Sequence, residues 1–226
     1  MFIDNYFLVL VVPTIILSMI AQVMVKSTFA KYSNIRCSRN ISGSDAAILL
    51  LKNNSITDVK VEAVQGTLTD HYDPRDKKLR LSQPVYGQPS IAAVGVAAHE
   101  AGHAIQHAKG YGPLVLRSTL VPVANIGSRF GPWIAIAGIF FSMPMLLNIG
   151  IVLFGGAVVF YLITLPVEFN ASSRALALLK SGNVLTAQEL EGAKKVLNAA
   201  ALTYVASALT ALMSFIRLLL IARGRR

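Results

Sequence analysis

The chain has 226 residues, of which 54% are hydrophobic, 14% are charged and one, Cys37, is a cysteine. This composition is too apolar for an ordinary soluble domain of this length and indicates a membrane protein, and a single cysteine excludes an intramolecular disulfide. The net charge of +10 comes from basic residues that cluster beside apolar stretches rather than among aromatic residues, so we expect no nucleic-acid partner.

The first predicted element is a transmembrane helix at residues 6–25, a segment without charged residues. A helix of about 20 residues rises about 30 Å, which matches the hydrocarbon core of a bilayer. A secretory signal peptide is the alternative, but Asp4 stands where a signal peptide has basic residues, and Lys26 and Lys31 follow the apolar segment instead. We therefore expect an uncleaved helix, in a domain of residues 1–25, with its N-terminus outside the cytoplasm.

Residues 26–129 are predicted to form the catalytic region, which begins with a short helix and a small sheet. Ser44 is the predicted N-cap of a helix that ends at about Lys52. Three predicted strands follow, the last two around a turn at Asp73-Pro-Arg-Asp: residues 59–64, 66–72 and 78–81. A sheet placed before the next helix is where a peptidase carries the edge strand that pairs with an extended substrate.

The next predicted helix contains the sequence His99-Glu100-Ala-Gly-His103, an instance of H-E-x-x-H. Four residues are close to one helical turn, so His99 and His103 share a helix face and can direct one nitrogen each at a zinc ion. A catalytic zinc needs a third protein ligand and an open position for water, from which Glu100 can take a proton as general base. The alternative is an ordinary helix with two hydrogen-bonded histidines, but the small and apolar neighbours favour a buried metal helix.

The other two histidines are weaker candidates. His71 can contact the substrate or the transition state, although a histidine that stabilises the turn through Asp70 or Asp73 is the more ordinary interpretation. His107 lies one turn beyond His103, but three ligands along one straight helix cannot converge on a tetrahedral ion. We therefore expect His107 to lie on the helix surface or to support a ligand.

Residues 130–167 contain no charged residue. One membrane helix needs about 20 residues, so this 38-residue stretch is either one very long span or two short ones. Asn148 and Gly150, with Pro144 nearby, offer a turn in the middle. We predict a transmembrane hairpin of residues 131–147 and 151–167.

Glu168 is the first carboxylate after the predicted hairpin, which returns the chain to the side that holds the two histidines. We therefore predict that Glu168 is the third metal ligand and that it opens a helix, with Arg174 available to support it. A carboxylate at a helix start is also favoured by the helix dipole alone. The rival ligands are Glu62, Glu189 and Glu191.

The end of the chain carries one more predicted membrane helix. Thr186 and Glu189 have the spacing of a capping box, in a region of residues 168–195. Residues 196–216 contain no charge, and a basic tail ending in Arg225 and Arg226 follows within the last domain, residues 196–226. We expect this segment to be a final transmembrane helix.

Several of these segments together resemble a known family. The order of an N-terminal span, DHYDPRDKKLRLS, SIAAVGVAAHEAGHAIQ, a hydrophobic hairpin and PVEFNASSRA is similar to the bacterial membrane family of neutral zinc metallopeptidases, type 2. More distantly, the chain resembles the heat-shock and CAAX-processing membrane peptidases. These imply a gluzincin site with His99, His103 and Glu168 as ligands and Glu100 as base. The distant relatives usually carry an aspartate four residues after the ligand glutamate, where this chain has Ser172, with Asn170 nearby.

We therefore expect a mainly α membrane protein with about four transmembrane helices and a small α+β zincin-like region with a short sheet before the HExxH helix. The expected function is that of a multi-pass zinc endopeptidase of the plasma (inner) membrane, which holds one Zn²⁺ and hydrolyses peptide or protein substrates, membrane-associated ones included. Basic residues gather on the side of the catalytic region, which places the active site in the cytoplasm. The alternative is a zinc-containing membrane scaffold or chaperone-like binder without turnover, although a purely structural site has no use for Glu100.

Overall fold

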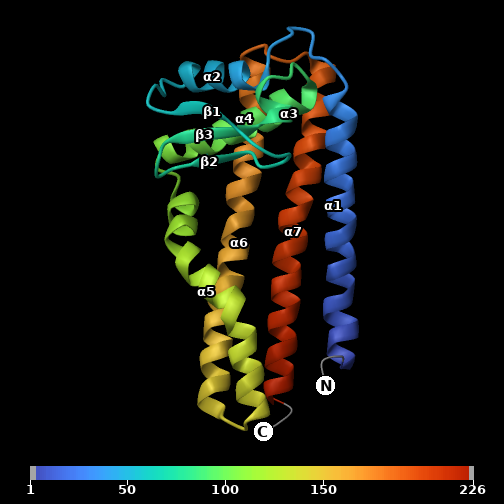
Figure 1. The fold of residues 1–226 in the computed structure, drawn as a ribbon, viewed down its shortest axis with the longest axis vertical. Helices are drawn as coiled ribbons and strands as arrows, with labels where there is room; N and C mark the ends of the chain where they lie inside the picture. The colour runs from blue at the N-terminus through green and yellow to red at the C-terminus, as the bar shows by residue number, and fades with distance from the viewer. Residues whose placement is uncertain (1–3, 224–226) are drawn as a thin grey trace. The chain divides into compact units, whose positions relative to one another are not determined.

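The computed structural model describes residues 4–223 and is mainly helical (Figure 1). The chain divides into two compact units. The first, which we call the helical unit, comprises residues 4–22, 112–166 and 202–223, and the second, the mixed unit, comprises residues 23–111 and 167–201. Their helices and strands, in chain order, are the π-helical turn Phe7–Val11, α1 (Val12–Ser33), α2 (Gly43–Asn53), β1 (Lys60–Val64), β2 (His71–Asp73), β3 (Lys78–Ser82), α3 (Gln83–Tyr86), α4 (Ile91–Ala108), α5 (Gly112–Phe140), α6 (Pro144–Ser181) and α7 (Ala187–Arg223).

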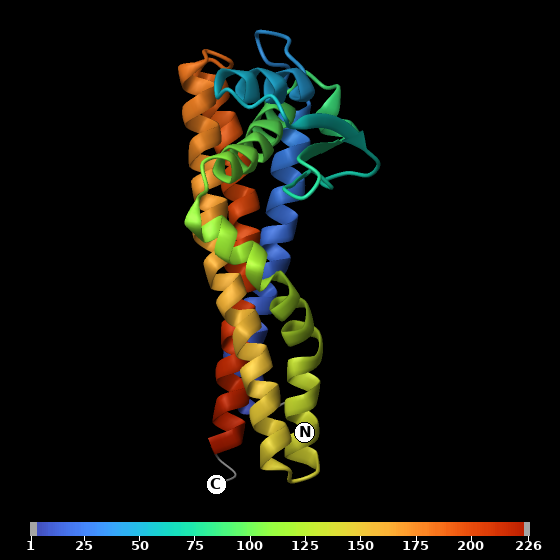
Figure 2. The same ribbon diagram turned by 90° about the vertical axis from the view of Figure 1, so that its left-hand side faces the viewer.

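The mixed unit contains a three-stranded sheet in the order β1-β3-β2 beside the helix α4 (Figures 1 and 2). β1 pairs with β3 in parallel, and β2 pairs with β3 as an antiparallel hairpin. The predicted strands are therefore confirmed, but β2 is shorter than the predicted 66–72. Gly66 and Leu68 have φ values of 106° and 58°, which no extended strand allows.

Helix α4 lies in the core of the mixed unit. Its N-cap is Ser90, whose hydroxyl accepts a hydrogen bond from the Ala93 N–H at 3.1 Å. Apolar side chains from the sheet and from α1, α2, α3, α6 and α7 pack in the same buried cluster, among them Phe29, Leu50, Leu79, Leu81, Val85, Leu179 and Val196. Because the core holds α4 on nearly all sides, its polar side chains occupy fixed positions.

The predicted cap of α2 is wrong by two residues. Ser42, not Ser44, has the extended backbone of an N-cap, and its Oγ accepts from the Asp45 N–H at 3.1 Å. Ser44 is buried inside the first turn. The predicted capping box of α7 is confirmed, since Thr186 N–H donates to Glu189 at 2.8 Å and Glu189 N–H donates to the Thr186 hydroxyl at 3.3 Å.

The predicted hairpin is present, but its turn is not at Asn148 and Gly150. α5 ends at Phe140 and α6 begins at Pro144, with Ser142 between them in the left-handed region at φ 54°. Gly150 serves the contact between the two helices instead, because a Cβ there would lie 2.3 Å from the Ala135 backbone nitrogen.

The structure also corrects the expected start of a helix at Glu168. α6 is one helix of 38 residues that continues through Pro166, so Glu168 lies in its interior. A proline inside a helix removes one backbone donor without ending the helix where neighbouring packing holds it. Glu168 therefore owes its position to α6 as a whole and not to a helix terminus.

Three of the described helices are long and apolar enough to cross a membrane: Phe7–Ser33, Pro144–Ser181 and Ala187–Arg223. They include the predicted first span, the second arm of the hairpin and the predicted last span. α5, the first arm of the hairpin, carries Arg117 and Arg129 and is not among them. The tail residues Arg225 and Arg226 lie outside the described residues.

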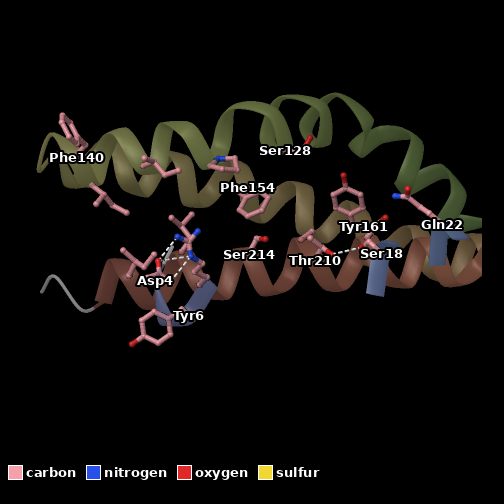
Figure 3. A pocket seen from close by; sticks show the side chains of 18 residues that line it. Asp4, Tyr6, Ser18, Gln22, Ser128, Phe140, Phe154, Tyr161, Thr210 and Ser214 are labelled. Carbon is pink, nitrogen blue, oxygen red and sulfur yellow. Dashed lines mark hydrogen bonds and ion pairs between the residues drawn. The ribbon is translucent and has the colours of Figure 1, made fainter. Parts of the chain in front are cut away.

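The helical unit has an open pocket of about 1110 Å³ between its helices (Figure 3). At one place in its wall, Arg217 of α7 donates to the Asp4 carboxylate at 2.7 Å. Elsewhere in the wall, the hydroxyls of Ser18 and Thr210 lie 3.3 Å apart. The Asp4 carboxylate pairs with a cation that follows the uncharged stretch of α7 from 196 to 216, where an unpaired charge would be costly in a membrane.

Candidate metal centre

The two histidines of the HEAGH sequence lie on one face of α4. The side chains of His99 and His103 are mostly buried, 12% and 10% exposed, and their rings meet edge to face with centroids 4.7 Å apart. Gly102 lies between them along the helix, where a Cβ would stand 2.8 Å from the Ala171 carbonyl oxygen of α6. Gly102 therefore permits the close approach of α4 to the segment of α6 that carries Glu168.

Glu168 is 2% exposed and directs one carboxylate oxygen, Oε2, at both histidines. The distances from this oxygen are 3.2 Å to His99 Nε2 and 3.5 Å to His103 Nε2. Among the described residues, these three form the group whose donor atoms all lie within 4.8 Å of one another.

The spacing of these atoms fits a zinc ion. Ligand atoms that each lie about 2.1 Å from one ion, at tetrahedral angles, are separated by about 3.4 Å. The two distances to Glu168 Oε2, 3.2 and 3.5 Å, bracket that value. Two imidazole nitrogens and one carboxylate oxygen are also the donor set of catalytic zinc sites that keep a fourth position for water.

Glu100 is buried, with 8% of its surface exposed, and does not belong to the three-residue donor group. Its carboxylate is nevertheless close enough to influence His103. Burial lowers the pKa of His103, but hydrogen bonding to Glu168 and the negative charge of Glu100 outweigh it, so the pKa is raised above its ordinary value. Glu100 therefore contributes negative charge beside the donor group without occupying a ligand position.

Each of the two histidines also has a polar partner at Nδ1, the ring nitrogen that does not face Glu168. Ser172 of α6 has its hydroxyl 3.1 Å from His99 Nδ1. Gln106 of α4 has its Oε1 3.0 Å from His103 Nδ1. Partners of this kind hold the ring orientation of metal-ligating histidines.

Sequence reasoning left the role of Ser172 unassigned and missed Gln106. Ser172 follows Glu168 by four residues and Gln106 follows His103 by three, so each lies on the same helix face as the residue that it follows. This spacing in the sequence could have identified both residues as neighbours of the candidate site. Arg174 does lie in this region, but its Nε donates to Asn170 at 2.7 Å and it supports the site through that residue.

The remaining histidines make other contacts. His71 is exposed on β2, with its Nδ1 2.8 Å from the Thr69 carbonyl and its Nε2 3.4 Å from Arg80. Its neighbour Tyr72 points to α4, where its hydroxyl lies 2.8 Å from His107 Nδ1. Side chains of successive strand residues face opposite sides, so His71 faces away from α4, and its contact with substrate stays a prediction.

The rival carboxylates are engaged elsewhere. Glu62 of β1 pairs with Lys78 at 3.0 Å, and Glu191 lies exposed 3.9 Å from Lys194. Glu189 caps α7 and also accepts from Ser38 at 2.6 Å. Glu168 is thus the carboxylate that the fold brings to the two histidines.

The sequence also matches known proteins along nearly its whole length. Residues 7–223 match the family model described as "Putative neutral zinc metallopeptidase". The chain is 48% identical over 215 residues to a Bacillus subtilis (strain 168) protein named "Putative membrane protease YugP", with 95% of this chain and 96% of that protein covered. No solved structure matches the chain significantly. Together with the three apolar helices, these matches indicate a membrane protein. The match along nearly the whole chain shows that it belongs to the neutral zinc metallopeptidase family of that description.

Proposed function

We propose that this protein is an integral-membrane zinc endopeptidase with His99, His103 and Glu168 as the zinc ligands and Glu100 as the general base. The observation that carries the proposal is the spacing of the three donor atoms around Glu168 Oε2, 3.2 and 3.5 Å, which suits one tetrahedral ion. A structural zinc site closes with four protein ligands, whereas three leave room for a water molecule.

His99, His103 and Glu168 would hold a zinc ion, which would supply Lewis-acid chemistry at the scissile carbonyl and at the attacking water. Glu100 accepts a proton from the attacking water and passes it to the nitrogen of the departing amine as the C–N bond breaks. Its burial beside His103 keeps this proton transfer out of bulk solvent. The water oxygen becomes part of the new carboxyl group, so the products are an acid and an amine.

The substrate is proposed to bind as an extended strand at the free edge of β2. β2 is an edge strand of the sheet. The Tyr72 hydroxyl of β2 contacts His107 Nδ1 of α4 at 2.8 Å. An added strand would use the backbone groups of β2 for affinity, and side-chain pockets would provide selectivity. This arrangement suits peptide segments without regular structure, from soluble or membrane-associated proteins.

We propose that the chain crosses the plasma membrane four times, with α5 as the fourth span, and that the metal centre faces the cytoplasm. The basic side is the one that holds Lys26, Lys31, Arg36, Arg39, Lys194 and Lys195. A reporter that is active only outside the cytoplasm should be silent when fused after Arg80 and active when inserted at Ser142, in the turn between α5 and α6. The opposite pair of results would reverse the orientation.

The function is tested with Glu100→Gln, which keeps the size of the side chain and removes its basicity. Loss of a general base typically lowers the rate by about 10²–10⁴-fold. We expect casein hydrolysis by the purified protein to fall by this factor, while zinc content stays near that of the wild type. Glu191→Gln, at an exposed acidic position on α7, is the matched control and should leave both unchanged. If Glu100→Gln hydrolyses casein at the wild-type rate, Glu100 is not the general base.

A further inference from the structure

The open pocket of the helical unit takes no part in the metal centre (Figure 3). Every residue that lines it belongs to the helical unit, and α1, α5, α6 and α7 each contribute to its wall. Figure 3 shows Phe140 at one end of the pocket and Gln22 at the other. Its uncharged polar side chains are those of Tyr6, Ser18, Gln22, Ser128, Tyr161, Ser207, Thr210 and Ser214.

Close helix contacts keep this pocket open. α5 packs tightly on α6, because Gly127 leaves no room for a Cβ against the α6 backbone. α6 packs on α7 through the rings of Phe154 and Phe215, whose centroids lie 6.0 Å apart. α1 is joined to α7 through the hydroxyls of Ser18 and Thr210, which lie 3.3 Å apart. α5 therefore cannot close onto α1 without breaking these contacts.

Three polar groups in the wall make no hydrogen bond with the residues that the structure describes: the Gln22 amide and the hydroxyls of Tyr161 and Ser214. Neighbouring hydroxyls are satisfied within their own helices; Ser128, for example, donates to the Ala124 carbonyl at 2.6 Å. The hydrocarbon core of a bilayer offers no water to an unpaired polar group, and leaving the group unpaired costs free energy. These three groups are therefore available to a partner that enters the pocket.

The pocket is longer than one leaflet of a bilayer. Ser207 and Ile221, which line it on α7, lie about 21 Å apart along the helix. Tyr6 and Gln22 span a similar length on the opposite wall. The hydrocarbon core is about 30 Å thick, so a single leaflet is about 15 Å. The acyl chain of one lipid would fill part of this length and would offer no hydrogen bond, whereas a transmembrane helix matches the length.

The charges of the pocket cancel. Arg217 donates to the Asp4 carboxylate at 2.7 Å, and the other lining residues carry no charge. An anionic lipid headgroup would have to displace Asp4 from Arg217, whereas an uncharged helix leaves this ion pair intact. Transmembrane helices associate through close packing of small residues and through hydrogen bonds between Ser, Thr, Asn and Gln side chains. A neutral helix with such side chains therefore complements the pocket in both charge and polarity.

We propose that this pocket binds one transmembrane helix of another membrane protein. The bound helix carries no charge within the bilayer and presents small and polar side chains to Gln22, Tyr161 and Ser214. The inference rests on the membrane crossings of the proposed function, because only a bilayer denies water to these three groups. It does not depend on the zinc site or on peptide hydrolysis.

The test uses the full-length protein in phosphatidylcholine vesicles and two synthetic transmembrane peptides. Both peptides are dansyl-labelled helices of leucine and alanine, about 20 residues long with lysines at the ends. One of them carries a single asparagine at its centre. Trp133, the only tryptophan of the chain, follows the lining residue Pro132 on α5. Energy transfer from Trp133 to dansyl therefore measures binding of a peptide beside α5.

We expect the asparagine peptide to bind the wild-type protein about 3–10-fold more tightly than the apolar peptide, which is the range for one interhelical hydrogen bond. Equal binding of the two peptides would overturn the proposal and point to an apolar occupant such as a lipid.

A triple variant, Gln22→Leu with Tyr161→Phe and Ser214→Ala, removes the three unpaired groups and changes the shape of the wall little. We expect its preference for the asparagine peptide to disappear and its affinity for the apolar peptide to stay unchanged. The control is Asn125→Leu, which removes an exposed amide of α5 outside the pocket and should keep the preference. A preference that survives in the triple variant, or that is lost in the control, would refute the pocket as the site. If the triple variant does not fold, the three single variants decide, because at least one of them should lower the preference.

Sedimentation of the protein in detergent, with and without the asparagine peptide, tests a second copy of this chain as the occupant. We expect the number of protein chains in the particle to stay the same, whereas a dimer that dissociates when the peptide is added would overturn the proposal. A protein that shows the peptide preference without cleaving casein would retain the pocket and end the proposed function. Casein hydrolysis without the preference would do the reverse.

Discussion

Glu168→Ala is the substitution that tests the metal centre most directly. It removes the oxygen that lies 3.2 and 3.5 Å from the two histidine nitrogens and leaves an α4 helix with two donors. Structural zinc sites with four ligands bind with about 10–16 kcal/mol, which is about 2.5–4 kcal/mol for each ligand. Since about 1.4 kcal/mol corresponds to a factor of ten, loss of one ligand should weaken zinc binding by about 10²–10³-fold.

The assay is a zinc titration of the purified protein in detergent against a fluorescent chelator of known affinity. Glu168→Ala should release zinc to the chelator under conditions where the wild type and Glu100→Gln retain it. Glu62→Gln, which changes a rival carboxylate on β1 that pairs with Lys78, should behave as the wild type does. A zinc dissociation constant for Glu168→Ala within about threefold of the wild-type value would refute the ligand assignment. The loss of a zinc ligand should weaken binding by much more than that.

Three further changes test how the site is held. Gly102→Val should lower both thermal stability and zinc affinity, measured by melting and chelator titration, because even a Cβ at Gly102 would lie 2.8 Å from an α6 carbonyl oxygen. Tyr72→Phe should lower casein hydrolysis but not zinc content, since it removes only the contact of β2 with His107; an unchanged rate would argue against β2 as the substrate edge. Ser82→Ala should lower the free energy of unfolding by about 1.5–3 kcal/mol at pH 7, because its hydroxyl bonds the Asp70 carboxylate at 2.9 Å. Burial raises the pKa of Asp70, so this loss should shrink as the pH falls through that raised pKa and Asp70 becomes neutral; a pH-independent loss would contradict the reasoning.

The features that the sequence determined by itself are local ones. The HEAGH spacing places His99 and His103 on one helix face because every α-helix has about 3.6 residues per turn. The β2–β3 hairpin follows from its turn residues, and the capping box of α7 follows from Thr186 and Glu189 alone. Each of these depends on interactions among residues a few positions apart, so the residue pattern is sufficient to predict them.

The position of the turn between α5 and α6 was not predictable in this way. Asn148 and Gly150 have the composition of a turn, but Gly150 is required where α6 packs closely on Ala135. A glycine that permits a turn and a glycine that permits close packing look the same in a sequence. The helix contact decided between them.

Tertiary structure alone decided which groups meet at the metal centre. Glu168 stands 65 or more positions from either histidine and in the interior of a 38-residue helix, so no local pattern places it. The contacts of Ser172 with His99 and of Gln106 with Asn170 likewise join α4 to α6. These distances depend on how closely two helices pack. Here that depends on Gly102, whose missing side chain lets the α6 backbone reach the face of α4 that carries His99 and His103.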